Sequence, residues 1–348
     1  MYSDSDLDSA VAAGALTPAS AAAFRAYVGR ARQSPMVDEE QFRLITGFND
    51  IFVSIAGILF LTGCAWAGGS VTPWLGAALV AVSSWGMAEY FTAKRRMALP
   101  SIIFLLAFVG GVFAAFGTFL VPDGAVGEDD RLGAALLALS AAIAVGGAWL
   151  HWRRFMVPIT IAAGAAAAAG MLFLLLLVAK PDAEKIMMPI ILAAGLGIFA
   201  FAMRWDMSDR ERITRRSDVA FWLHLLAAPM IVHPIFVMLG LTAGDASIGV
   251  AGVVLAIYLA LGAVALIIDR RALMVSALAY VLAAMGALFK EFGAVSLNVA
   301  ITALVIGSAL LLLSAFWHDV RAWLVQMLPE GVQTRLPVTQ TVIPQPAS

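Results

Sequence analysis

Long apolar stretches dominate this sequence and constrain its fold more than any motif does. About ten of them, each of roughly 18 to 25 residues, follow one another between Phe48 and Trp317. Each is long enough to cross the ~30 Å hydrocarbon core of a bilayer as a helix. With 62% apolar and only 13% charged residues, the chain cannot hide this surface inside a soluble fold. Because only helices and closed barrels span lipid, we expect an all-α, polytopic transmembrane helix bundle.

The ten expected spans form two groups of five. In chain order they cover residues 48–67, 71–91, 99–121, 132–150, 155–179, 186–203, 219–241, 248–268, 272–289 and 293–317. These spans divide the chain into three parts. A leader occupies residues 1–46, a ten-span transmembrane domain occupies residues 47–318, and a C-terminal segment with a flexible tail occupies residues 319–348.

The basic residues give an independent indication of topology, because Lys and Arg accumulate on the cytoplasmic side of a membrane. With ten spans, 18 of the 22 basic residues fall on one side. The other side holds only Arg131, Lys180, Lys185 and Lys290. Adding or removing one span would scramble this partition, so it favours ten spans with both termini in the cytoplasm. The arginine-rich connection of residues 204–218 is expected to contact anionic lipid.

The two ends of the chain carry further helix signals. Gly14 is expected to end a short helix that begins at Leu7, and Thr17 followed by Pro18 is typical of an N-cap with proline in the first turn. A helix pair this small cannot bury a core. It must therefore dock on the transmembrane domain, on lipid headgroups, or on a cytoplasmic protein partner bound by residues 5–32. Residues 319–328 are expected to form a short amphipathic helix at the interface.

The leader also carries a resemblance. Its residues 10–20 read Ala-Val-Ala-Ala-Gly-Ala-Leu-Thr-Pro-Ala-Ser and precede a helix. This pattern resembles the leader of an uncharacterised family of bacterial multi-span membrane proteins, in which a short helix, a Gly-x-Leu/Ile-Thr/Ser turn and a second helix follow one another. The resemblance implies a location in the bacterial inner membrane. It implies no activity and no functional residues.

The seventh expected span is the most unusual because it contains His224, Pro229, His233 and Pro234. Proline removes a backbone donor, so this helix is expected to kink or break near the middle of the membrane. At 1.5 Å per residue, His233 lies roughly 21 Å into the span, and ionisable groups at such depth mark candidate functional sites. His233 is then either a proton relay or substrate-binding group, or a neutral imidazole hydrogen-bonded to a neighbouring helix. Nine residues separate the two histidines and place them on opposite faces, so they cannot share a metal ion.

Other polar residues complete the candidate sites. Asn298 and Tyr280, on the last two spans, are the residues we expect to complete a pocket with His233. Asp50 and Glu89 are candidate interfacial carboxylates that could meet each other, pair with Lys94 or Arg95, or serve as caps. The chain has a single cysteine, which excludes an internal disulfide and a multi-thiolate zinc site. We find no catalytic constellation, metal site, cofactor motif or nucleic-acid-binding pattern, so no enzymatic activity is expected.

Two classes of function follow from this reading. Ten spans in two groups of five favour a small-solute or proton-coupled transporter, because a repeat with an odd number of spans is automatically inverted. The alternative is a non-transporting membrane sensor or assembly protein whose N-terminal helices bind a cytoplasmic partner.

Overall fold

The computed structural model describes residues 10–24, 48–121, 130–210, 214–240, 248–271 and 316–337, together with the single positions 7, 212, 274, 278, 304, 307 and 308. These residues form helices and connections, and no strand occurs among them. The chain divides into two compact units, residues 1–46 and residues 47–348.

The leader has the expected local structure in its described residues. A helical turn at residues 10–12 ends at Gly14, whose φ of 71° is a left-handed conformation that glycine adopts without strain. Residues 18–24 form the next helix. The Thr17 hydroxyl accepts a hydrogen bond from the Ser20 backbone N–H at 3.0 Å, as an N-cap does. Gly14 thus ends the first helical turn and Thr17 caps the next helix, as the sequence predicts.

The second unit consists of long helices that match the first eight expected spans closely. They are α3 (Phe48–Gly69), α4 (Pro73–Met87) continued by the π-helix η2 (Ala88–Lys94), α5 (Ala98–Leu120), α6 (Asp130–Phe155), α7 (Ile159–Ala179), α8 (Met187–Met207), α9 (Arg215–Met238) and α10 (Ile248–Ile268). The short 3-10 helix η3 (Pro181–Ile186) leads into α8. Most of the last two expected spans, residues 272–289 and 293–317, lies outside the described residues.

Six of the described helices are long and apolar enough to cross a membrane: α3, α5, α6, α7, α8 and α9. These helices and α4 carry large apolar side chains that are exposed in the structure. Phe52 is 64% exposed, Val82 on α4 is 72% exposed and Leu172 is 62% exposed. Side chains of this size at this exposure need an apolar solvent. The chain is therefore a multi-pass helical membrane protein in contact with the lipid bilayer.

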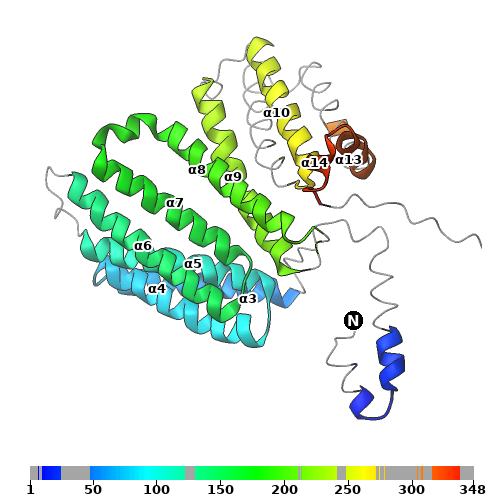
Figure 1. Ribbon diagram of the computed structural model, residues 1–348. Helices are drawn as coiled ribbons and strands as arrows, with labels where there is room; N and C mark the ends of the chain where they lie inside the picture. Colours follow the sequence, from blue (N-terminus) through cyan, green and yellow to red (C-terminus); the bar gives the residue numbers. More distant parts are fainter. Residues whose placement is uncertain are drawn as a thin grey trace, which may run out of the picture. The chain divides into compact units, whose positions relative to one another are not determined.

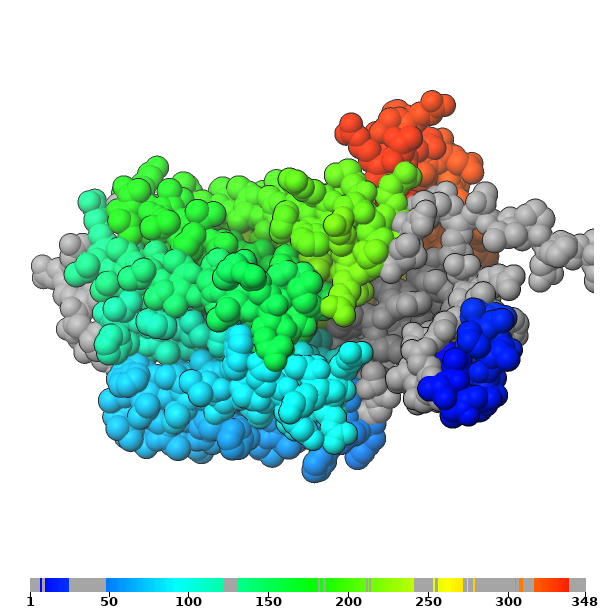
Figure 2. Space-filling view, turned by 60° about the horizontal axis from the view of Figure 1, so that its bottom comes forward, coloured from blue at the N-terminus to red at the C-terminus, as the bar shows by residue number. Residues whose placement is uncertain are grey.

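Helices that follow one another in sequence pack side by side. Contacts join α3 with α4, α4 with α5, α5 with α6, α6 with α7 and α8 with α9, and α9 also lies against α7. The colours in Figures 1 and 2 accordingly run across this unit in chain order, from the cyan α4 and α5 to the green α7, α8 and α9. Most of the contacts between helices in this unit therefore join helices that are adjacent in the sequence.

Small residues set the closest helix approaches. A Cβ added at Gly76 would lie 2.5 Å from the Ala65 carbonyl oxygen, and one at Gly195 would lie 2.8 Å from the Met230 Cβ. Glycine is therefore required where α3 meets α4 and where α8 crosses α9. Small residues at helix crossings are the usual means of packing in a membrane, where lipid competes for every apolar contact.

The proline-containing span differs from the expectation in one respect. We expect a kink or break at Pro229 and Pro234, but α9 continues as a helix from Arg215 to Met238. Buried Ile231 and Val232 lie between the two prolines, and Met230 packs directly on Gly195 of α8. Packing against neighbouring helices holds the backbone helical although two N–H donors are missing.

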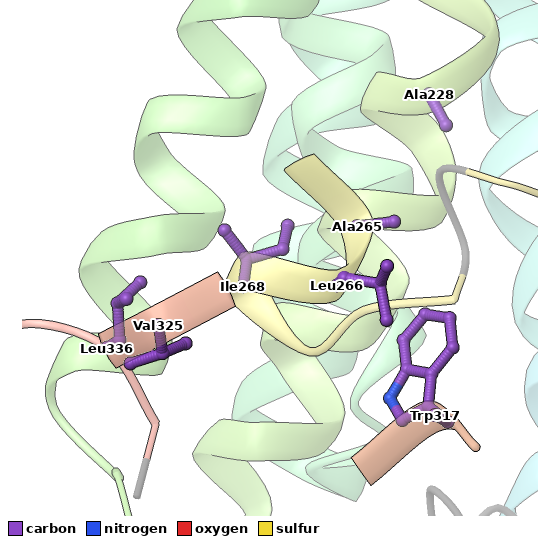
Figure 3. Packing of buried hydrophobic residues seen from close by; sticks show 7 residues of the cluster. All are labelled: Ala228, Ala265, Leu266, Ile268, Trp317, Val325 and Leu336. Carbon is purple, nitrogen blue, oxygen red and sulfur yellow. The ribbon is translucent and has the colours of Figure 1, made fainter. Parts of the chain in front are cut away.

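The C-terminal segment forms α13 (Trp317–Gln326) and α14 (Glu330–Gln333). The amphipathic helix expected for residues 319–328 is thus present. Figure 3 shows how this segment packs at the end of α10. One apolar cluster joins the segment to α9 and to the end of α10 through Ala228, Ala265, Leu266, Ile268, Trp317, Val325 and Leu336.

Candidate polar site at one end of the bundle

Three buried side chains meet at the end of α8. The Asp206 carboxylate, in the last turn of α8, accepts a hydrogen bond from Arg270 Nη2 at 2.5 Å and another from Arg270 Nε at 3.2 Å. His224 of α9 places its Nε2 2.8 Å from Asp206 Oδ2. Relative exposure is 2% for Asp206, 0% for His224 and 1% for Arg270. Charged groups persist at such depth when each has a partner of opposite charge or a hydrogen bond.

The turn after α10 aims Arg270 at this cluster. The Arg270 N–H bonds the Ala265 carbonyl at 2.9 Å and the Asp269 N–H bonds the Leu266 carbonyl at 3.2 Å, the pair of bonds that defines a Schellman C-cap. Asp269 adopts the left-handed conformation with φ of 56°. Arg270 then reaches past Asp206 to the Ser217 carbonyl at 3.1 Å and the Ser217 hydroxyl at 3.2 Å. One guanidinium therefore ties the ends of α8, α9 and α10 together.

Asp269 is the centre of a second, adjoining charged group. Its carboxylate accepts hydrogen bonds from Arg212 Nη1 and from Trp317 Nε1, each at 2.8 Å, and Arg321 Nε lies 3.7 Å away. Burial favours the neutral carboxyl, but the charges of Arg212 and Arg321 and the Trp317 N–H outweigh it. The pKa of Asp269 consequently lies below its usual value. Burial, aided by the charge of Arg270, lowers the pKa of the Arg212 guanidinium.

The connection between α8 and α9 turns several polar side chains inward. Asp209 Oδ2 accepts hydrogen bonds from the Thr214 N–H at 3.0 Å and the Thr214 hydroxyl at 2.6 Å. It also accepts one from the Ser217 N–H at 3.3 Å, so it caps the start of α9. Arg212 is directed at Asp269. The exposed arginines of residues 204–218 are Arg204, Arg215 and Arg216. The expected contact with anionic lipid would involve these three side chains.

Of the histidines and prolines singled out by sequence, only His224 joins the charged cluster. His233 and Pro229 lie on an exposed part of α9, and Pro234 is buried. A separation of nine residues along α9 places His233 about 13.5 Å from His224. Asn298 and Tyr280, expected to complete a pocket with His233, lie outside the described residues.

Of the two candidate interfacial carboxylates, Glu89 has an ion-pair partner on another helix. Glu89 pairs with Arg154 of α6 through bonds of 2.9 and 2.6 Å, rather than with Lys94 or Arg95. Arg95 Nη2 instead donates to the Tyr90 hydroxyl at 3.2 Å. Asp50 is buried in the first turn of α3. Glu89 and Arg154 belong to helix ends that the alternating topology assigns to one side, and their pairing is consistent with that assignment.

Sequence reasoning missed the partners of His224. Asp206 and Arg270 fall in the connections between expected spans, where charged residues are usually solvated. A signal was nevertheless present, because Asp206 follows the apolar stretch of residues 186–203 within a single helical turn. His151, directly after the fourth expected span, is also fully buried, with Nδ1 3.3 Å from the Thr160 hydroxyl. Its ring packs against Phe155 at a centroid distance of 4.5 Å.

The cluster combines a proton acceptor with a fixed cation. Asp206 Oδ2 is shared by His224 and Arg270, so a proton bound by His224 would place two cations on one carboxylate. His224 Nδ1 is buried and has no hydrogen-bond partner in the structure as described. No group of three or more His, Cys, Asp or Glu side chains that could hold a metal ion occurs among the described residues.

Comparison with protein-family models, with curated proteins and with solved structures finds no match to this chain. The fold and the buried cluster define the class of protein, a multi-pass helical membrane protein with a charged group enclosed at one end of its bundle.

Proposed function

We propose that this protein is a proton-coupled transporter of a small solute in the bacterial inner membrane, and that Asp206 and His224 bind the coupled proton. The observation that carries the proposal is the buried contact of 2.8 Å between His224 Nε2 and Asp206 Oδ2. Ionisable groups enclosed in a membrane protein are costly to maintain and commonly mark a proton or substrate path. Histidine is suited to this role because an imidazole nitrogen can accept and release a proton, and histidine serves as a proton carrier in many proteins.

Arg270 supplies a means of coupling. In the state described, Arg270 and His224 converge on Asp206 while Arg270 also holds Ser217 at the start of α9. Protonation of His224 would add a second positive charge close to the guanidinium, and the two cations would repel each other. Release of Arg270 would free the end of α10 from α8 and α9. A proton would thereby change how three helices are joined, which is what alternating access requires.

We further propose that this end of the bundle faces the cytoplasm. Contacts bring the arginine-rich ends of α6, α8 and α10 together, because Trp152 packs with Val219 in one cluster and Arg270 binds Asp206. Arg153 and Arg154 end α6, and Arg204 and Arg210 lie at the end of α8 and just beyond it. An excess of arginine at one end supports a cytoplasmic location.

The leader supports the alternative function, a membrane sensor or assembly protein. Its described residues expose Leu16 and Phe24 at 37% and 42%. Phe24 lies on the short capped helix and Leu16 directly precedes its N-cap, and exposed apolar side chains on such a segment suit binding in the groove of a cytoplasmic partner. This alternative needs no proton site.

The proposal is tested by electrical recording from proteoliposomes adsorbed on a solid-supported membrane. Amino acids, monocarboxylates, sugars and amines are applied in turn with and without a proton gradient. We expect a current with at least one solute class that grows with the proton gradient and is lost in His224→Gln. His233→Gln, at an exposed position on the same helix, serves as the matched control and should retain the current.

Each variant is first shown to elute as a single species in detergent. A current lost in His233→Gln but kept in His224→Gln would move the proton site along α9 and contradict the role given to Asp206. The absence of current with every solute class would contradict transport and favour the sensor or assembly alternative.

A further inference from the structure

Helix α13 has three distinct faces rather than two. At about 100° per residue, Trp317, Arg321 and Val325 share one face, and all three are buried. Asp319 and Gln326 share a second face, which is exposed and polar. A helix that covers a soluble core needs only two faces, an apolar face that is buried and a polar face that is exposed. The third face of α13 therefore needs a separate explanation.

The third face is apolar and exposed. Phe316, at the N-cap of α13, is followed after seven residues by Trp323 and after four more by Met327. Their exposed fractions are 52%, 58% and 62%. We call these three residues the apolar stripe. The same spacings place all three within about 40° of one another around the helix. The stripe lies roughly 140° from the buried face and adjoins the polar face.

Polar contacts fix the rotation of α13 and so keep the stripe exposed. Trp317 Nε1 donates to Asp269 at 2.8 Å, and Arg321 Nη2 donates to the Pro337 carbonyl at 2.8 Å. The segment is tied to the α8–α9 connection by Arg210 Nε, which donates to the Leu336 carbonyl at 2.8 Å. Turning the helix to bury Trp323 would break these bonds. The stripe is thus held outward by the structure.

Basic side chains lie in and near the segment that carries the stripe. The Arg271 guanidinium lies 5.0 Å from the Trp317 ring centroid, at the first turn of α13. Arg335 follows α14 and is exposed. Exposed Arg204 lies in the last turn of α8, whose connection to α9 is bonded to Leu336. A segment that combines exposed tryptophan and methionine with arginine matches a membrane surface, where anionic headgroups adjoin the upper part of the acyl chains.

We propose that the apolar stripe docks α13 into the headgroup layer of the bilayer, with Phe316, Trp323 and Met327 facing the acyl chains and Arg271 and Arg335 binding anionic phospholipid. The three faces of α13 then meet three surroundings: protein, lipid and water. A helix lying along the interface beside a bundle requires this division. The assignment is independent of whether the protein transports a solute.

The chain has a single native cysteine, so removing it allows a label to be attached at one chosen position. Four variants are prepared in the Cys64→Ser background. Trp323→Cys and Met327→Cys lie in the stripe, and Asp319→Cys and Gln326→Cys lie on the polar face. Each is labelled with a nitroxide and reconstituted in vesicles of phosphatidylethanolamine and phosphatidylglycerol. Collision with oxygen, which concentrates in lipid, is compared with collision with a water-soluble nickel chelate.

We expect the oxygen-to-nickel collision ratio at positions 323 and 327 to exceed that at positions 319 and 326 several-fold. Similar, low ratios at all four positions would show a stripe in water and overturn the proposal. Weak collision with both reagents at 323 and 327 would show that protein covers the stripe, which also overturns it. Equal ratios in vesicles with and without phosphatidylglycerol would overturn the role given to Arg271 and Arg335.

Discussion

Replacing Arg270 with Met is expected to lower the free energy of unfolding by about 3–5 kcal/mol, because it removes one partner of a buried ion pair. Asp206 would keep only His224 while remaining enclosed, and the Ser217 carbonyl and hydroxyl would each lose a donor. Methionine retains much of the volume of the arginine side chain, so the loss reports charge and hydrogen bonding. Equilibrium unfolding in mixed micelles of SDS and a mild detergent measures it.

Two further variants isolate the cause. Adding Asp206→Asn to Arg270→Met removes the uncompensated charge and should restore most of the lost stability, since replacing both partners of a buried pair is often close to neutral. Arg154→Met breaks the exposed pair with Glu89, whose side chains are 53% and 36% exposed. It should change stability by less than about 1 kcal/mol. If Arg270→Met proved as mild as Arg154→Met, the cluster would not join the helices.

The second large effect is expected at Trp317. Trp317→Ala empties a buried site in the cluster that holds the C-terminal segment and removes the N–H donor to Asp269. Truncation of a buried aromatic residue of this size costs about 3–5 kcal/mol. Because the site lies at the start of α13, the loss should appear as local opening. Hydrogen–deuterium exchange of peptides covering residues 317–337 should accelerate strongly, while exchange in α6 and α7 stays unchanged.

The matched control is Trp323→Ala, in the same helix, where the side chain is 58% exposed. In detergent this variant should leave exchange of residues 317–337 almost unchanged, as for most surface substitutions. Equal acceleration in the two variants would mean that Trp317 does not anchor the segment.

Hydropathy and local helix signals predicted much of the fold. The eighth expected span has the same bounds as α10, and the third and sixth differ from α5 and α8 by a few residues at each end. A run of apolar residues is a local property that lipid converts directly into helix. The second span was harder to define, because α4 ends at Met87 and a π-helix continues to Lys94. That change of hydrogen-bond pattern has no sequence signature comparable to hydropathy.

The candidate site could be predicted only in part, because its members are far apart in sequence. Asp206 and Arg270 are separated by 64 residues. Asp206 follows Arg204 by two residues and Arg270 lies between Asp269 and Arg271, so each resembles one more charge in an ordinary connecting segment. Depth along the span drew attention to His233, whereas burial by neighbouring helices distinguishes His224. Depth follows from counting residues, but burial depends on which helices pack together.

The central proposal is that the chain crosses the membrane repeatedly and that its arginine-rich helix ends lie in the cytoplasm. Single cysteines at Lys180, Ser208 and Arg335, all exposed, in the Cys64→Ser background can be labelled with a membrane-impermeant maleimide in cells whose inner membrane is intact. We expect the cysteine at 180 to react in intact cells, and those at 208 and 335 to react only after the inner membrane is disrupted. Reaction of positions 180 and 208 from the same side would contradict the crossing of α8, and reaction of 208 and 335 from outside would contradict the orientation.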